Sequence, residues 1–291
     1  MKPNRRSILG MMPLALAAAG KPRPAAPIPR ALRDRLWLWC HAAGSHNTGW
    51  GISTPSRITP VEAAFYMGIP NAIFVRYEGS PEPPFDQYAL PFASLREVVW
   101  SVVGAAGETG AAEREAVIAL ARRNANFSGV MMDDFFEVRR EGKFAALTVA
   151  ELGELQGKLK SGGKPLDLWV VLYDRQLRPE MKPYLEQCDG ITFWTWKAAE
   201  LANVRENFER LEKLAPRARK LLGCYMYDYG ARQPMSVAAM ESQCEQGREW
   251  LRQGRIEGMI FLASCICDLK LEAVEWTRRW IAENGGRKAR G

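Results

Sequence analysis

The sequence contains eight short, nearly continuous apolar runs separated by longer amphipathic or loop segments, and this alternation constrains the fold most. Such short apolar runs are typical of parallel strands that are covered on both faces. Strands that alternate with helices indicate a parallel sheet built from βα units. The predicted strands are Leu36–His41, Ala72–Tyr77, Val98–Val103, Gly129–Asp134, Leu168–Asp174, Gly190–Trp196, Leu221–Asp228 and Gly258–Ser264.

Helix start and stop signals stand between these runs. Thr59 and Thr148 are each followed three residues later by Glu, which is the pattern of a capping box. Ser236 is placed to cap a third helix, and Gly254 is placed to end it. The periodicity predicts two further helices, over residues 113–123 and 201–214.

Eight such units in roughly 255 residues match the usual size of a single (β/α)8 barrel, the TIM barrel of the α/β class. A doubly wound open sheet is the alternative. That fold usually carries a Gly-rich nucleotide-binding turn after its first strand, whereas here the strand is followed by His41-Ala42-Ala43-Gly44-Ser45. We therefore predict one (β/α)8 barrel domain over residues 35–291.

The N-terminus resembles an export signal. Asn4-Arg5-Arg6-Ser7 has the twin-arginine pattern, and the apolar stretch after it is too short to span a bilayer. We predict a cleaved signal peptide over residues 1–19 and a Pro/Ala-rich linker over 20–34, with a frayed N-terminal helix as the alternative. No Cys follows the apolar stretch, so we expect the twin-arginine export machinery as a partner, no stable membrane anchor, and a periplasmic or secreted bacterial protein.

Charge and cysteine content limit the classes of partner and ligand that we expect. Removing residues 1–19 takes away Lys2, Arg5 and Arg6, so the formal charge falls from +7 by three to +4. The other basic residues are spread along predicted helices, and we expect no nucleic-acid partner because such a footprint requires clustering. The six Cys lack zinc-site spacing, since Cys265 and Cys267 are too close together. We expect free, buried thiols, no metal and no cofactor.

Polar and aromatic residues concentrate at the predicted strand ends, where the active sites of (β/α)8 barrels lie. Asp133 and Asp134 end the fourth strand. Because strand side chains alternate, we expect one of them to point into the mouth and the other towards the helices, and the sequence leaves open which. The other candidates are Asp228, His41, Arg76, Glu78, Asp174, Trp194, Trp196, Tyr225 and Tyr227.

Carboxylates and aromatic rings around one concave site suit carbohydrate chemistry. Glycoside hydrolysis needs one carboxyl as an acid and a second as a base or nucleophile. We predict that Asp133 or Asp134 and, across the mouth, Asp228 are the catalytic carboxyls. Rings such as Trp196 and Tyr227 would offer flat apolar surfaces to a sugar.

Each of these features also has a purely structural interpretation. The two adjacent Asp side chains could cap backbone amides or pair with Arg76, and Arg76 could instead pair with Glu78. The tryptophans at the end of the sixth strand could pack between barrel and helices. His41, a candidate for binding a hydroxyl or tuning a pKa, could be a hydrogen-bonded wall residue.

Two segments resemble the chitinase-like family of glycoside hydrolases. Gly129–Asp133 is similar to the strand-four region of that family, which continues as D-x-D-x-E. Asp133 matches the last Asp, but Phe135 stands where the catalytic Glu belongs. Tyr225–Gly230 is similar to the family's M-x-Y-D-Y segment, whose Tyr and Asp contact the substrate, although the family carries it on strand six rather than seven. The resemblance implies a glycosidase-type barrel that acts on a glycan.

These observations predict an exported carbohydrate-active enzyme, a glycoside hydrolase that uses carboxylates at the strand ends. The alternative is a barrel that binds sugars without cleaving them, because the strand-four Glu is absent. A third hypothesis is a metal-dependent hydrolase using His41, His46 and the two Asp residues. It ranks last, because the chain has only two His and no H-x-H or H-E-x-x-H spacing.

Overall fold

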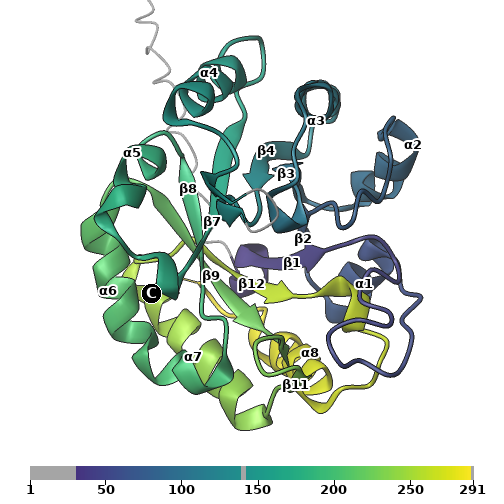
Figure 1. The fold of residues 1–291 in the computed structure, drawn as a ribbon. Helices are drawn as coiled ribbons and strands as arrows, with labels where there is room; N and C mark the ends of the chain where they lie inside the picture. Colours follow the sequence, from purple (N-terminus) through teal and green to yellow (C-terminus); the bar gives the residue numbers. More distant parts are fainter. Residues whose placement is uncertain (1–30, 139–141, 290–291) are drawn as a thin grey trace, which may run out of the picture.

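Eight parallel strands close into a barrel in the computed structural model, which describes residues 31–138 and 142–289 (Figure 1). Their order around the barrel is β1-β12-β9-β8-β7-β4-β3-β2, and β1 closes the ring by pairing with β12. The (β/α)8 prediction is therefore confirmed, and the open sheet is excluded. The strands are β1 Leu36–Cys40, β2 Asn71–Phe74, β3 Glu97–Val103, β4 Phe127–Met132, β7 Asp167–Tyr173, β8 Gly190–Trp194, β9 Arg219–Tyr225 and β12 Gly258–Leu262.

Helices surround the strands on the outside of the barrel (Figure 1). Because each strand is covered by helices outside and by side chains of the other strands inside, nearly every strand residue is buried, as the continuous apolar runs require. The α-helices are α1 Pro60–Met67, α2 Asp86–Ala89, α3 Ala111–Arg123, α4 Val149–Lys160, α5 Lys182–Leu185, α6 Val204–Leu214, α7 Val237–Gln253 and α8 Glu272–Asn284.

The predicted helix caps are confirmed. The side chains of Thr59 and Thr148 each accept a hydrogen bond from the N–H of the Glu three residues later, and the carboxylate of that Glu accepts one from the Thr backbone N–H. Ser236 caps α7 by accepting from the Ala239 N–H, and α7 ends at Gly254, whose φ of 73° lies in the left-handed region.

A short ordered segment precedes the first barrel strand, which begins at Leu36. Residues 31–34 fall in the proposed linker, but Leu32–Arg35 forms a 3-10 helix, Ala31 bridges to Lys288, and Leu32 is buried. The proposed signal peptide and linker residues 20–30 lie outside the described residues. In the described part of the chain, no helix is long and apolar enough to cross a membrane.

All six Cys are free thiols in the structure, and all but the half-buried Cys188 are buried. Burial raises the pKa of each of these thiols, so they remain protonated and pack as small apolar groups.

Two small hairpins stand at the C-terminal ends of the strands. After β4, Phe136–Val138 (β5) pairs with Lys143–Ala145 (β6). After β9, Tyr227–Asp228 (β10) pairs with Gln233–Pro234 (β11). The seventh barrel strand therefore stops at Tyr225 and not at Asp228 as predicted, because the chain leaves the barrel to form this hairpin.

Candidate active site

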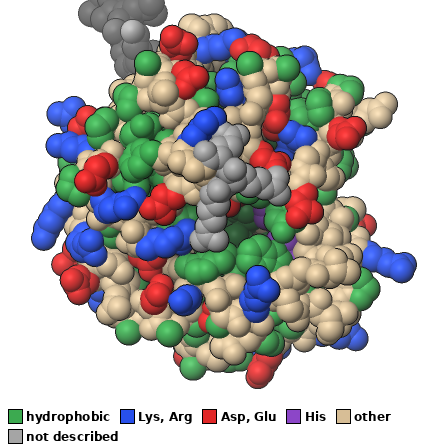
Figure 2. Space-filling model, in the orientation of Figure 1, with side chains coloured by type: hydrophobic (Ala, Val, Ile, Leu, Met, Phe, Trp, Pro, Cys, Tyr) green, Lys and Arg blue, Asp and Glu red, His purple; other side chains and the backbone are tan. Residues whose placement is uncertain are grey.

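A cavity of about 490 Å³ opens at the C-terminal ends of the barrel strands. Figure 2 shows the hollow, with hydrophobic side chains at its base, His at one side, and acidic and basic side chains around its rim. This is the end of the barrel at which (β/α)8 enzymes carry their sites. The cavity volume lies within the range of about 300–1,000 Å³ that is usual for small-molecule sites.

Side chains from five strands form the floor of the cavity: Trp39, Val171, Trp194, Tyr225 and Leu262. The Trp194 indole N–H donates to Thr192 Oγ1 at 2.8 Å, which fixes its ring. The neighbouring β9 carries Gly223, where an added Cβ would lie 2.1 Å from the Trp194 ring. The glycine therefore leaves the space that this tryptophan occupies.

One wall of the cavity is aromatic. Trp50, in the loop after β1, lies edge-on to Trp196 and Tyr229 with ring centroids 5.9 and 5.4 Å apart. His46 and Tyr77 continue this wall, with centroids 5.5 Å apart. Edge-to-face contacts of this kind stabilise aromatic clusters and hold the rings in fixed orientations.

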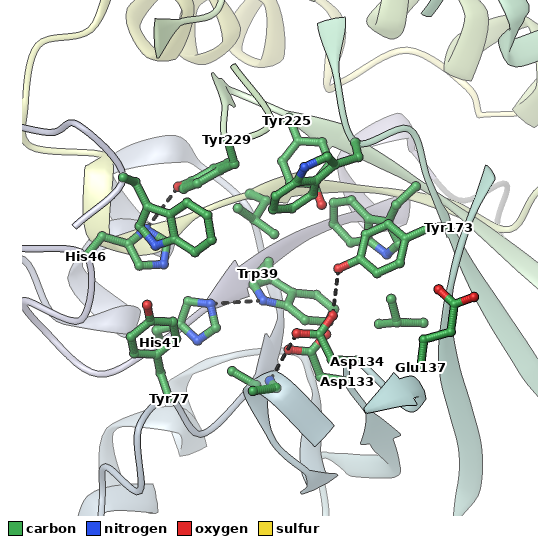
Figure 3. Close-up of a pocket in the computed structure, with 18 of the residues that line it drawn as sticks. Trp39, His41, His46, Tyr77, Asp133, Asp134, Glu137, Tyr173, Tyr225 and Tyr229 are labelled. Carbon is green, nitrogen blue, oxygen red and sulfur yellow. Dashed lines mark hydrogen bonds between the residues drawn. The ribbon is translucent and has the colours of Figure 1, made fainter. Parts of the chain in front are cut away.

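Both Asp133 and Asp134 line the cavity, so the expectation that only one would face the mouth is wrong. Strict alternation ends with β4 at Met132, and Asp134 has a φ of 41°, which turns its side chain back towards the same side (Figure 3). Phe135 is fully buried, packs against Phe136 and Tyr184, and does not line the cavity.

Both carboxylate oxygens of Asp134 accept hydrogen bonds. The Tyr173 hydroxyl donates to Oδ1 at 3.0 Å, and the Ala106 backbone N–H donates to Oδ2 at 3.0 Å (Figure 3). These two hydrogen bonds fix the orientation of the Asp134 carboxyl group from two sides.

The Asp133 side chain is buried, with only 6% of its surface exposed. Burial raises the pKa of Asp133 well above its usual range, and the negative charge of Asp134 adds to this effect. A hydrogen bond from the Asp134 backbone N–H opposes it. A carboxyl whose pKa is raised by burial can hold a proton near neutral pH and donate it as a general acid.

His41 lines the cavity but has both ring nitrogens occupied. The Trp39 indole N–H, which can only donate, lies 3.2 Å from Nε2 and makes it the acceptor. Nδ1 must then carry the proton and donates to the Val75 carbonyl at 2.9 Å. Burial lowers the pKa of His41 to about 4, despite the opposing Val75 hydrogen bond. His41 is thus a neutral wall residue in this structure, and not a group free to bind a hydroxyl.

His46 lies beside it, with ring centroids 5.1 Å apart. Its Nδ1 is 3.0 Å from the Tyr229 hydroxyl. Burial lowers the pKa of His46 well below its usual range, and the proximity of His41 lowers it further. Both histidines are therefore neutral near pH 7 and contribute ring surface to the cavity.

Asp228 does not face the two aspartates across the mouth. It is buried outside the cavity, where Oδ2 accepts from the Ala198 N–H at 3.2 Å and Oδ1 from the Ala231 N–H at 2.9 Å. Tyr227 is also outside the cavity, and its hydroxyl donates to the Trp50 carbonyl at 3.0 Å. Because the chain turns into the β10–β11 hairpin, these two residues hold loops together.

Arg76 and Asp174 also lie outside the cavity. Arg76 forms an ion pair with Glu113, and not with Glu78 or the aspartates. Asp174 is buried and accepts from the Arg175 N–H at 2.8 Å. The cavity therefore contains His41, Glu78, Asp133, Asp134, Trp194, Trp196 and Tyr225 from the predicted set, of which Glu78 is at the exposed rim.

Several lining residues are absent from the predicted set. Trp39 could have been found, because it lies two residues before His41 in a strand and so shares its face. Tyr173 and Tyr229 stand at strand ends, but nothing in their spacing separates them from Asp174 and Tyr227. Trp50 comes from a long loop without periodicity. No sequence signal places it at the mouth.

In the part of the chain that the structure describes, no three His, Cys, Asp or Glu side chains are grouped to hold a metal ion. The set proposed for a metal-dependent hydrolase fails geometrically, because His41 has no free nitrogen and Asp134 has both oxygens engaged. The structure therefore gives the third hypothesis no support.

The fold and the site define a (β/α)8 barrel with an aromatic, carboxylate-bearing mouth. No protein-family model matches the chain, and no curated protein matches it in sequence.

Among solved structures, it is similar to active domain 2 of a Pyrococcus furiosus chitinase complexed with chito-oligosaccharides (13% identity, 82% of this chain and 86% of the other, TM-score 0.52). It is also similar to YKL-39 in the presence of chitooligosaccharides (11% identity, 84% of this chain and 98% of the other, TM-score 0.51). A third similar structure is a mutant of the P. furiosus tryptophan synthase α-subunit (10% identity, 88% of this chain and 98% of the other, TM-score 0.53). At these identities the similarity establishes the TIM-barrel fold alone.

Proposed function

We propose that this protein is a glycoside hydrolase in which Asp133 is the general acid and Asp134 the partner carboxylate. One observation carries the proposal: in an aromatic cavity, a buried carboxyl whose raised pKa favours its neutral form lies beside a second carboxyl that accepts hydrogen bonds at both oxygens. Two of the similar barrels were solved with chito-oligosaccharides, which supports a saccharide as ligand. Asp228, first predicted as the second carboxyl, has no part in this assignment.

In the proposed reaction Asp133 donates its proton to the glycosidic oxygen, and the bond from that oxygen to the anomeric carbon breaks. The Asp134 carboxylate stabilises the positive charge that develops at the anomeric carbon. Water supplies the hydroxyl that completes the new hemiacetal, and its second proton restores the acid. The rings of Trp196 and Tyr225 offer apolar surface to the sugar, and Glu78 at the rim can accept hydrogen bonds from its hydroxyls.

The test compares Asp133→Asn, Asp134→Asn and the matched control Asp174→Asn, whose carboxyl is buried outside the cavity. Release of reducing ends from chito-, cello- and xylo-oligosaccharides is measured together with the thermal midpoint. We expect each cavity variant to lose at least about a hundredfold in kcat, the usual contribution of a positioned acid or base, while the control keeps its activity. Full activity in both cavity variants would end the assignment.

A barrel that binds saccharide without cleaving it is the second candidate function. The observation in its favour is Phe135, which stands where the chitinase-like pattern has Glu and is buried away from the cavity. Saccharide binding by the wild-type protein without any release of reducing ends would favour this function over hydrolysis.

We also propose that residues 1–19 direct export by the twin-arginine machinery and that the protein acts in the periplasm or outside the cell. The Arg5-Arg6 pair supports this. Replacing both with Lys should leave the protein in the cytoplasmic fraction at its precursor mass, whereas unchanged localisation would contradict the proposal. No nucleic acid and no stable membrane anchor are expected to take part.

A further inference from the structure

The cavity is walled on all sides. A groove running across the barrel would leave two opposite strand ends outside its lining, but here every strand contributes a residue at or just beyond its end. These are Trp39 (β1), Tyr77 (β2), Ala105 (β3), Asp133 (β4), Tyr173 (β7), Trp194 (β8), Tyr225 (β9) and Leu262 (β12).

Three segments raise this wall above the strand ends. They follow β1, β4 and β9, which are separated by two or three strand positions around the closed ring, so they stand on different sides of the mouth. Their cavity-lining residues are His46 and Trp50 in the loop after β1, Phe136, Glu137 and Val138 in β5, and Gly230 and Arg232 around the β10–β11 turn.

These segments are joined to one another or to the barrel by direct contacts. The Trp50 carbonyl accepts the Tyr227 hydroxyl at 3.0 Å, which ties the loop after β1 to β10. Glu137 in β5 pairs with Arg178, beyond β7, at 2.5 Å. The segments that line the cavity beyond the strand ends are thus part of the folded structure.

The volume sets the number of sugar units that fit. A hexose unit within a chain has eleven non-hydrogen atoms and displaces about five to six water molecules, or roughly 170 Å³ at ~30 Å³ per water, and the N-acetylhexosamine unit of a chito-oligosaccharide is larger. A cavity of about 490 Å³ therefore holds at most about three units. Asp133, with 6% of its surface exposed, is buried in the cavity lining directly after the end of β4, whereas Glu78 is at the exposed rim.

We propose that this site takes the end of a glycan chain or a short free saccharide, to a depth of at most about three units, and does not bind the interior of a polymer. The inference rests on the proposed saccharide function and specifies the substrate class. Because the acid is buried in the cavity lining, the bond that is cleaved is one or two units from a chain end. The product is a mono- or disaccharide.

The first test measures binding against chain length. Chito- and cello-oligosaccharides of one to six units are titrated into Asp133→Asn, which prevents turnover, with tryptophan fluorescence and calorimetry as readouts. We expect the affinity to rise up to the third unit, and each further unit to change Kd by less than about twofold, or ~0.4 kcal/mol. An affinity that still rises strongly from the fourth to the sixth unit would overturn the inference.

The second test follows the wild-type protein on hexamers labelled at the reducing end. Early products confined to mono- or disaccharide and the shortened chain support the inference. Trimers formed by cleavage at the centre would overturn it and leave the hydrolase assignment intact. Affinity that stops rising at three units, without any cleavage, would support the inferred binding of chain ends but end the hydrolase assignment. Failure to bind any saccharide would overturn both proposals.

A matched pair of variants tests the wall. Trp50→Ala removes a side chain that packs on Trp196 and Tyr229, and it should move the affinity plateau to longer oligosaccharides. Leu90→Ala changes a side chain that is 71% exposed outside the cavity, and it should leave the plateau in place. An unmoved plateau in a folded Trp50→Ala protein would contradict the role of this wall. If that variant fails to fold, the wild-type chain-length series decides.

Discussion

The hydroxyl of Tyr173, at the end of β7, donates a 3.0 Å hydrogen bond to Asp134 Oδ1, beyond the end of β4. The two strands are neighbours in the barrel, so the bond joins adjacent strand ends. It orients the Asp134 carboxyl, whereas no side-chain hydroxyl in the described part of the chain donates to Asp133. In the proposed reaction, Tyr173 is a positioning residue.

Tyr173→Phe should therefore reduce kcat and leave KM nearly unchanged, and it should also lower the thermal midpoint because the same hydrogen bond contributes to stability. A hydrogen bond to a charged group contributes about 1.5–3 kcal/mol, so we expect a loss of about ten- to a hundredfold. Tyr229→Phe is the control, because it removes a hydroxyl in the same cavity that contacts His46 and not a carboxylate. Equal losses of kcat in the two variants would show that Tyr173 has no specific link to the reaction.

The raised pKa of Asp133 predicts a defined pH dependence of stability. Because folding favours the protonated carboxyl, the contribution of this group is complete below its usual pKa near 3.8 and is lost as the pH rises through the higher folded-state value. In urea unfolding from pH 3 to pH 8, the stability of the wild type relative to Asp133→Asn should decline as the pH rises. Parallel curves for the two proteins would mean that the carboxyl is not desolvated by folding.

Asp228→Asn tests the corrected role of that residue. Its carboxylate accepts two backbone N–H groups, and the amide retains only one acceptor oxygen. We expect the free energy of unfolding to fall by about 1–2 kcal/mol, with kcat unchanged at temperatures where the variant is folded. A large loss of kcat in the folded variant would return Asp228 to the catalytic set.

The barrel was predictable because its signals are local. Parallel strands buried on both faces must be apolar throughout, and caps such as Thr59 and Ser236 mark helix starts within a few residues. The site was only partly predictable, since strand alternation stops where a strand stops. Asp134 reverses direction through its positive φ, and Asp228 leaves the mouth because a hairpin begins at Tyr227. Both outcomes depend on loop contacts that no spacing encodes.

Gly223→Ala should disturb the cavity floor. Its Cβ would lie 2.1 Å from the Trp194 ring, and overpacking of this kind costs about 1–3 kcal/mol in stability. We expect a lower thermal midpoint and altered tryptophan fluorescence. The control is Gly157→Ala in α4, where an added Cβ meets nothing within 4 Å and the change should stabilise the helix by about 0.5–1 kcal/mol. A Gly223→Ala protein as stable as the wild type would show that the floor can rearrange freely.

His41 predicts acid sensitivity. Its pKa falls from 6.5 to about 4 in the folded state, so its contribution to stability is complete above pH 6.5 and is lost as the pH falls towards 4. The shift corresponds to roughly 3 kcal/mol at about 1.4 kcal/mol per pH unit. His41→Gln retains a donor for Val75 and an acceptor for Trp39 without titrating, and should lose much less stability over this range.

Since the chain has only two histidines, His41→Gln combined with His46→Gln removes all histidine titration and reports the carboxyl contribution alone. If the wild type, the single variant and the double variant lose stability in parallel between pH 6.5 and 4, the neutral, doubly hydrogen-bonded state of His41 is wrong.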